Sequence, residues 1–121
     1  MTWTLPGPAW LFCPADRPDR YAKAAARADV VIVDLEDAVA PADKQAARDA
    51  LVATPLDPER TVVRINPVGT EDHGPDLEAL SRTPYTRVML PKCESGDQVR
   101  SLAPLEVVAL VESPLGVLAV E

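Results

Sequence analysis

Five short apolar runs are the most regular feature of the sequence. They lie at residues 10–13, 30–35, 61–65, 87–90 and 106–111. Each is rich in apolar residues at consecutive positions rather than at alternate ones. This is typical of strands buried on both faces of a parallel sheet, whereas the strands of an antiparallel meander alternate. The pattern therefore predicts five parallel strands.

Segments with helical character separate these runs. They span residues 17–28, 41–53, 75–82 and 96–103. In the second segment, Ala47 and Leu51 fall on one helical face while Lys44 and Arg48 occupy another. An amphipathic helix of this kind covers a sheet with its apolar face. The chain is thus predicted to repeat a strand and a helix.

Strictly alternating strands and helices fit two architectures, the open doubly wound sheet and the closed eight-stranded barrel. A dinucleotide-binding open sheet needs a glycine-rich turn after its first strand, but the five glycines form neither G-x-G-x-x-G nor a P-loop. A closed barrel needs about 250 residues. The absence of the glycine-rich turn favours the closed (β/α)8 TIM barrel of the α/β class, of which 121 residues would supply about the first five βα units.

Charged residues follow the apolar runs, where a barrel gathers its functional groups. They are Arg17 after the first run, Glu36 and Asp37 after the second, Arg64 in the third, Lys92 after the fourth and Glu112 after the fifth. Solvated loop starts would explain most of them. Arg64, between Val63 and Ile65, and Glu112, directly after VVALV, are explained less well, because a charge beside an apolar run costs several kcal/mol unless it is paired.

The overall charge limits the partners. Twelve Lys and Arg against 19 Asp and Glu give a net charge of −7, which repels phosphate backbones and anionic membrane surfaces. No apolar stretch approaches the roughly 20 residues of a membrane span, and the first ten residues lack a signal-peptide pattern. We expect a cytoplasmic protein with no nucleic-acid or membrane partner.

Five segments together carry a family resemblance: LFCPADRPDRYAKA, VVIVDLEDAVAPADK, VVRIN, VMLPKCES and ALVESPLGVL. In this order they resemble the citrate lyase β subunit (CitE-like) family, within the HpcH/HpaI aldolase superfamily. The resemblance implies a TIM barrel, usually a homotrimer, that uses Mg²⁺ to cleave or form a carbon–carbon bond in a β-hydroxyacyl thioester. Citryl-, malyl- and citramalyl-CoA are such substrates, and the products are an acyl thioester and a keto acid. The same resemblance implies that residues 1–121 are the N-terminal portion of a single TIM-barrel domain.

The resemblance also implies roles for residues. Glu112 corresponds to a carboxylate ligand of the metal, while the second ligand and a catalytic lid are expected beyond residue 121. Arg64 is expected to bind the substrate carboxylate or a carbonyl oxygen, because its planar fork of donors matches a carboxylate. Glu36 is expected to orient Arg64 or metal-bound water, with Asp37 as nearby support.

Three further residues are less tightly constrained. Lys92 is expected to hydrogen-bond a carbonyl oxygen, with an imine role as the less favoured alternative. Arg17 either faces the phosphates or adenine of CoA or is an ordinary surface residue. His73, the only histidine, is expected to be an ordinary loop residue.

Alternatives to the thioester lyase remain open at this stage. One is a class II pyruvate-type aldolase that acts on free hydroxy-keto acids without CoA. Another is a non-catalytic half-barrel fragment. The sequence also leaves open whether CoA or an acyl carrier protein carries the thioester.

Overall fold

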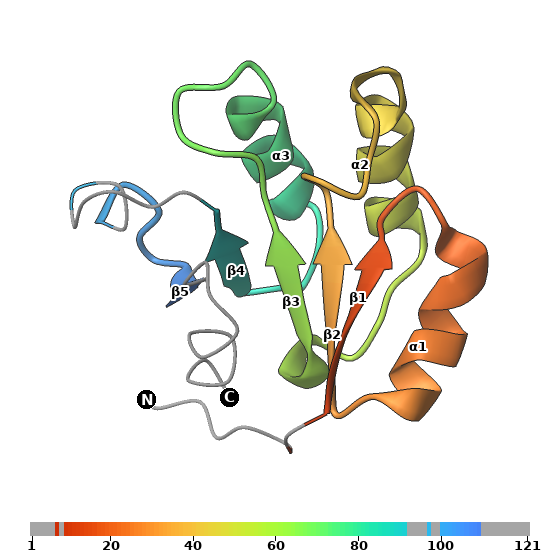
Figure 1. The fold of residues 1–121 in the computed structure, drawn as a ribbon. Helices are drawn as coiled ribbons and strands as arrows, with labels where there is room; N and C mark the ends of the chain where they lie inside the picture. Colours follow the sequence, from red (N-terminus) through yellow and green to blue (C-terminus); the bar gives the residue numbers. More distant parts are fainter. Residues whose placement is uncertain (1–6, 8, 92–96, 98–99, 110–121) are drawn as a thin grey trace.

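Five parallel strands lie side by side in chain order, β1-β2-β3-β4-β5, and point in one direction (Figure 1). The computed structural model describes residue 7 and residues 9–91, 97 and 100–109. The strands are β1 Trp10–Pro14, β2 Val30–Asp34, β3 Thr61–Arg64, β4 Arg87–Leu90 and β5 Glu106–Ala109. Each begins at the first residue of a predicted apolar run, so the prediction of five parallel strands is confirmed.

Three α-helices follow the first three strands: α1 Tyr21–Arg27, α2 Lys44–Ala53 and α3 His73–Leu80. Short 3-10 turns precede α1, α2 and β3: η1 Pro18–Arg20, η2 Pro41–Asp43 and η3 Pro58–Arg60. Each turn starts with a proline, whose fixed φ and missing N–H suit a first helical turn. None of the helices in the described part of the chain has the length and hydrophobicity needed to cross a lipid bilayer.

The first three predicted helices are confirmed, although α1 and α2 begin only after the turns η1 and η2, at Tyr21 and Lys44. The third begins at His73, two residues earlier than expected, so the expectation that His73 is an ordinary loop residue is wrong. The predicted helix over 96–103 lies only partly within the described residues, of which Asp97 and Arg100 are helical.

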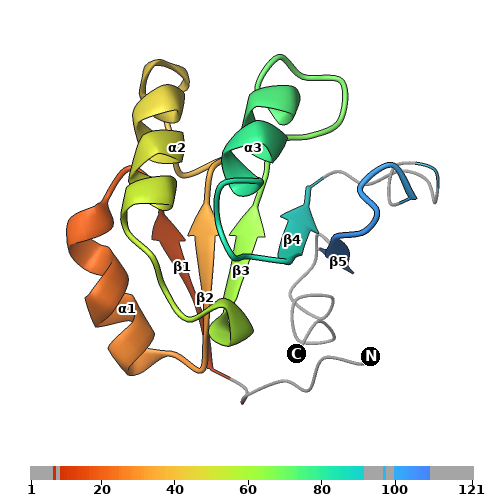
Figure 2. The same cartoon turned by 180° about the vertical axis from the view of Figure 1, so that it is seen from behind.

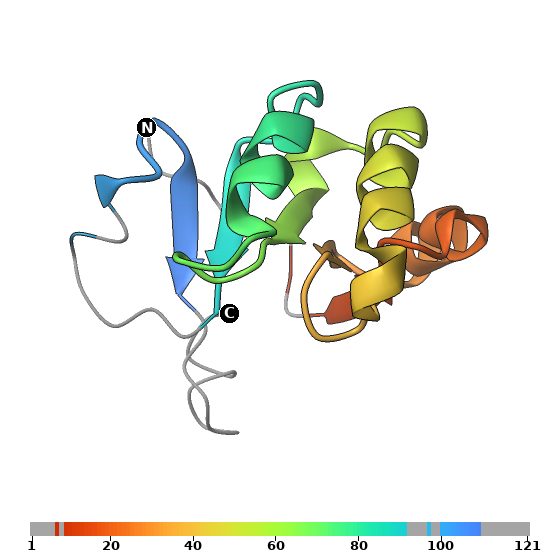
Figure 3. The ribbon, with the colours of Figure 1, turned by 90° about the horizontal axis from the view of Figure 1, so that it is seen from above.

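The three helices gather along one face of the sheet (Figure 2, Figure 3). On that face Val33 and Val63 pack in one core cluster with Tyr21 of α1, Leu51 of α2 and Leu80 of α3. All five side chains are at most 3% exposed. Since successive side chains of a strand point to opposite faces, the neighbouring strand positions form a separate surface.

We call that separate surface the inner floor. It is the cluster of Val30, Ile32, Val62 and Met89, with Trp10 and Val108 packed against it. All six come from strands, and no helix residue among those described joins them. The inner floor therefore belongs to the face of the sheet that the helices leave uncovered.

Strand order and helix placement distinguish the two candidate architectures. In a doubly wound sheet the strand order reverses and helices cover both faces, whereas a barrel keeps its strands in chain order with all helices outside. The described chain has the second arrangement. The predicted (β/α)8 class is confirmed for these strands, with the inner floor on the side of the barrel interior.

The helix-covered core can be tested at Leu51. Its side chain is 1% exposed on α2, so Leu51→Ala is expected to lower the free energy of unfolding by about 2–5 kcal/mol through lost apolar burial and the cavity that remains. Val52→Ala, at the adjacent half-buried position, serves as the control and should lose clearly less. Equal losses in urea denaturation would contradict the assignment of the helix faces.

Candidate active site

A buried ion pair joins the carboxyl ends of β2 and β3. Asp34 and Arg64 are register partners, and Arg64 donates from Nε to Oδ1 of Asp34 at 2.9 Å and from Nη2 to Oδ2 at 2.5 Å. Asp34 also accepts from the backbone N–H groups of Glu36 at 2.8 Å and Ala38 at 3.1 Å. The Asp34 side chain is 0% exposed and that of Arg64 12%. Four donors thus fix one buried carboxylate and, with it, the guanidinium.

Arg64 lies beside the inner floor. The ring of Phe12 on β1 faces its guanidinium carbon, with the ring centre 4.7 Å away, which is cation–π geometry. Burial by itself lowers the pKa of Arg64, but the hydrogen bonds to Asp34 raise that pKa above its ordinary value. The group therefore keeps its charge next to apolar side chains, where water screens it less than in bulk solution.

Glu36 lies near Arg64 without being its main partner. Its Oε1 is 3.8 Å from Nε of Arg64, too long for a hydrogen bond. The predicted pairing of Arg64 with Glu36 is present only as this long contact, and the short hydrogen bonds come from Asp34. Burial raises the pKa of the Glu36 carboxyl, and a hydrogen bond with the exposed Asp37 raises it further.

A hollow of about 480 Å³ opens beside Glu36, between the loop after β2 and the loop after β3. The residues that line it are Glu36, Asp37, Val39, Pro41 and Lys44 from the first loop and the start of α2, and Asn66, Pro67, Thr70, Glu71 and Asp72 from the second.

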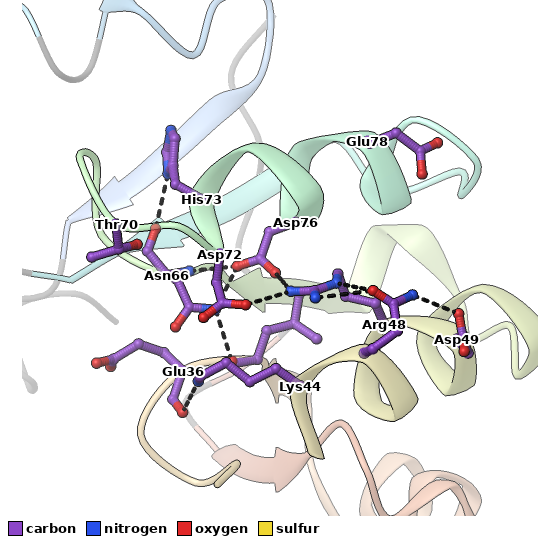
Figure 4. Close-up of polar contacts among 12 residues, drawn as sticks. Glu36, Lys44, Arg48, Asp49, Asn66, Thr70, Asp72, His73, Asp76 and Glu78 are labelled. Atoms are coloured by element: carbon purple, nitrogen blue, oxygen red, sulfur yellow. Dashed lines mark hydrogen bonds and ion pairs between the residues drawn. The ribbon is translucent and has the colours of Figure 1, made fainter. Parts of the chain in front are cut away.

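Asn66 ties these two loops together (Figure 4). Its Nδ2 donates to the carbonyl oxygen of Leu35 at 3.0 Å and to Oδ2 of Asp76 at 2.6 Å, and its backbone N–H donates to the same Asp76 oxygen at 2.7 Å. Asn66 is 5% exposed and Asp76 0%. Asn66 thus links Leu35, the neighbour of Glu36, to Asp76 of α3. We call the group of Asn66, Asp76 and its partner Arg48 the buried clamp.

Arg48 balances the charge of Asp76 (Figure 4). Its Nη1 donates to Asp76 at 3.0 Å and to Asp72 at 3.1 Å, and Gln45 accepts from its Nε and Nη2. Burial by itself lowers the pKa of Arg48, but the hydrogen bonds to the two aspartates raise it above its ordinary value. The buried charges of α2 and α3 are therefore paired, as burial requires.

Two more side chains fix the loop backbones. Lys44 donates from Nζ to the carbonyl oxygens of Leu35 at 3.0 Å and Glu36 at 2.9 Å. Nδ1 of His73 lies 2.9 Å from the carbonyl oxygen of Asn66 and donates to it. Both side chains bind backbone oxygens at the carboxyl edge of the sheet, so the segment that carries Glu36 is held from several directions.

The remaining predicted residues are not brought together by the described structure. Arg17 has a 47% exposed side chain whose Nε lies 3.4 Å from Asp19. Lys92 and the predicted metal ligand Glu112 lie outside the described residues. Within residues 7, 9–91, 97 and 100–109 no three His, Cys, Asp or Glu side chains converge on a possible metal position. Glu36 and Asp37 supply oxygen donors that suit Mg²⁺, but they form a site only with further ligands.

Comparison with known proteins identifies the family of this chain. Residues 9–121 match the family model described as HpcH/HpaI aldolase/citrate lyase. The chain belongs to the HpcH/HpaI aldolase/citrate lyase family. It is 69% identical over 116 residues to a citrate lyase subunit beta-like protein of Mycobacterium tuberculosis. The aligned residues make up 96% of this chain and 42% of that protein. The chain thus spans less than half the length of that relative.

Two crystal structures of family members match the fold. One is CitE from Mycobacterium tuberculosis in complex with magnesium, acetoacetate and coenzyme A, with a TM-score of 0.86 and 71% identity over 87% of this chain and 39% of that chain. The other is the citrate lyase beta subunit from M. tuberculosis with oxaloacetate and magnesium, with a TM-score of 0.86 and 70% identity over 91% of this chain and 49% of that chain. The family resemblance read from the motifs is confirmed.

Three residues of the site were missed by the sequence reading: Asp34, Arg48 and Asp76. A signal existed for Asp34, because it stands between Val33 and Leu35 just as Arg64 stands between Val63 and Ile65. An acidic residue inside one apolar run and a basic residue inside the next suggest that the two side chains form a buried ion pair. Arg48 and Asp76 gave no such signal, since both lie on helices where charged residues are ordinarily solvated.

Asp76 tests the buried clamp. Asp76→Asn leaves Arg48 without its buried charge partner, so the free energy of unfolding is expected to fall by about 3–5 kcal/mol. Asp72→Asn is the matched control, because Asp72 binds the same guanidinium but its side chain is 23% exposed, and it should cost about 1 kcal/mol or less. Equal losses of the free energy of unfolding, measured by chemical denaturation, would show that the buried Asp76 contact stabilises the fold no more than the partly exposed Asp72 contact.

Glu36 gives a pH-dependent prediction. Because folding raises the pKa of Glu36, ionisation opposes folding, and the stability of the wild type falls as pH rises from the ordinary Glu pKa through the raised one. Glu36→Gln imitates the protonated form. Its free energy of unfolding should therefore match that of the wild type near about pH 4 and exceed it near about pH 7. Glu78→Gln, which removes an exposed carboxylate, should give no such gain, and a Glu36→Gln variant that is less stable at neutral pH would contradict the prediction.

Proposed function

We propose that the protein containing this chain is a Mg²⁺-dependent carbon–carbon lyase, similar to the citrate lyase β subunit. It would cleave or form a β-hydroxyacyl thioester such as citryl-, malyl- or citramalyl-CoA, with an acyl thioester and a keto acid as products. The observation that carries the proposal is the charged Arg64 fork, fixed by Asp34 at the carboxyl ends of parallel strands. Relatives crystallised with magnesium, coenzyme A and keto acids support it.

The reaction explains why a fixed cation is useful here. In the cleavage direction the carbinol hydroxyl gives its proton to a base, and the bond between the carbinol carbon and the α carbon breaks. The carbinol becomes the carbonyl of the keto acid, and the bonding electron pair leaves as an enolate on the thioester fragment, which takes up a proton to give the acyl thioester. A bound Mg²⁺ would supply Lewis-acid stabilisation of the charge that develops on oxygen. Arg64 would bind the carboxylate or carbonyl oxygen of the keto-acid fragment through hydrogen bonds to a permanently charged donor. Both fragments stay oriented while charge develops.

The other residues would have supporting roles. Glu112 would hold the metal as a carboxylate ligand. Glu36, buried next to Arg64, would accept hydrogen bonds from metal-bound water, with Asp37 as its neighbour. Lys92 would hydrogen-bond a carbonyl oxygen. In this proposal the polar residues that follow strands β2 to β5 would surround one reacting centre.

The thioester and the assembly complete the proposal. Arg17, exposed at the start of the segment that leads into α1, would bind phosphates of CoA. Residues 1–121 would form the N-terminal portion of one barrel domain, closed by later strands. The barrels would assemble as homotrimers in the cytoplasm.

A direct assay tests the proposed activity. The full-length protein is incubated with Mg²⁺ and citryl-CoA, malyl-CoA or citramalyl-CoA, and the released keto acid is measured. Free hydroxy-keto acids are assayed in parallel. Cleavage of a thioester that stops on addition of EDTA is expected. Cleavage of free acids alone would favour a class II pyruvate-type aldolase, and inactivity on both sets would favour a non-catalytic role.

The metal ligand is tested by Glu112→Gln. Removal of one anionic oxygen ligand should abolish turnover and weaken Mg²⁺ binding in titration calorimetry at least about tenfold. Glu106→Gln is the control, because Glu106 is the first residue of β5 and pairs with Arg87 at 2.8 Å. It should leave Mg²⁺ affinity unchanged. Wild-type affinity in Glu112→Gln would overturn the ligand assignment.

A further inference from the structure

We propose that Asp34 is a positioning residue for catalysis, which determines the edge of the Arg64 guanidinium that faces the substrate. This inference rests on the proposed function, in which Arg64 binds a substrate carboxylate or carbonyl oxygen. It assigns a function to a buried aspartate that makes no contact with the substrate itself.

The two edges of the guanidinium are used differently. Asp34 takes the side edge, because Nε and Nη2 donate to its two oxygens at 2.9 and 2.5 Å. The end edge consists of Nη1 and the second N–H of Nη2. Among the described residues no side chain or backbone oxygen accepts a hydrogen bond from Nη1. A carboxylate can therefore bind the end edge through two parallel hydrogen bonds.

Asp34 is itself unable to turn away. Its oxygens accept the backbone N–H groups of Glu36 at 2.8 Å and Ala38 at 3.1 Å, and its side chain is 0% exposed. The ring of Phe12 covers the guanidinium at 4.7 Å. The end edge of Arg64 is thus oriented before substrate binds, so little conformational entropy remains to be lost on binding.

The position of Asp34 in the sheet shows why it is suited to this role. Asp34 and Arg64 lie in one register row with Pro14, Met89 and Val108. In this row the ion pair is flanked by apolar residues, and the inner floor lies directly beneath it. Without Asp34 the nearest described carboxylate is that of Glu36, 3.8 Å from Nε. Loss of Asp34 is therefore expected to turn the guanidinium toward Glu36 and to change the direction of its end edge.

Glu36 is the competing candidate for this role. Its carboxylate lies 3.8 Å from Nε, and it contributes no short hydrogen bond to Arg64. Asp34 holds two donors of the same group. The geometry therefore assigns the orientation of Arg64 to Asp34 and leaves Glu36 available for other contacts.

A double-mutant cycle in the full-length protein tests the inference. The wild type, Asp34→Asn, Arg64→Lys and the double variant are assayed with Mg²⁺ and the active CoA thioester, and pyruvate binding is measured by calorimetry. Asp34→Asn is expected to lower kcat/KM at least about tenfold, the effect of a lost hydrogen bond to a charged group. In the Arg64→Lys background, which has no fork to orient, the same substitution should change kcat/KM less than about threefold.

A matched control separates positioning from general destabilisation. Asp76→Asn also removes a fully buried aspartate from an arginine pair, at 3.0 Å from Arg48, but does not touch Arg64. Any effect that it has on kcat/KM should be equal in both Arg64 backgrounds. An effect of Asp34→Asn that is equally large in both backgrounds would overturn the inference, because a purely structural loss does not depend on Arg64.

A measurement on the wild type keeps the inference testable if Asp34→Asn does not fold. In protein labelled with ¹⁵N-arginine, the Nε–H signal of Arg64 is assigned by its absence from Arg64→Lys. On addition of Mg²⁺ and pyruvate this signal should stay in place while the Nη signals of Arg64 shift. Displacement of the Nε–H signal by pyruvate would show that the ligand takes the edge assigned to Asp34. A wild type without thioester cleavage or pyruvate binding would instead overturn the proposed function, and the inference with it.

Discussion

Two buried aspartates, Asp34 and Asp76, each need a cation and backbone or amide donors, and this requirement holds the carboxyl edge of the sheet in place. An unpaired charge in such surroundings costs several kcal/mol. Asp34 is satisfied by Arg64 and two backbone N–H groups, and Asp76 by Arg48 and Asn66. The loops after β2 and β3 therefore have little freedom to move apart.

The two ion pairs lie on opposite faces of the sheet and have different consequences. The pair of Arg48 and Asp76 joins α2 to α3 on the helix-covered side, where it stabilises loop geometry (Figure 4). The pair of Asp34 and Arg64 lies on the side of the inner floor, where Nη1 of Arg64 has no acceptor among the residues that the structure describes. The same kind of ion pair thus holds two helices together on one face and orients the guanidinium of Arg64 on the other.

The DLED segment, residues 34–37, contributes side chains to both faces of the sheet. Its first aspartate, Asp34, is fully buried and orients Arg64, while Glu36 is buried beside it with a raised pKa and Asp37 is exposed. Leu35, between them, points into the helix-covered core and offers its carbonyl oxygen to Asn66 and Lys44. Four consecutive residues therefore serve four different environments, because the strand ends there and its alternation gives way to a turn.

The sequence by itself determined the five strands, the first three helices, the barrel class and the family, because continuous Val-rich runs and amphipathic segments are local patterns that burial enforces. It also singled out Arg64 and Glu36 as residues at one edge of the sheet. It did not determine which carboxylate binds Arg64, that Asn66 and His73 hold loop backbones, or that Arg48 and Asp76 are buried. Only the tertiary structure decided these points, since strand register places Asp34 opposite Arg64 across 30 residues of chain, and helix packing brings Arg48 to Asp76 across 28. Hydrogen bonds between such distant residues depend on distances of a few tenths of an ångström, which no local pattern of hydrophobic and polar residues contains.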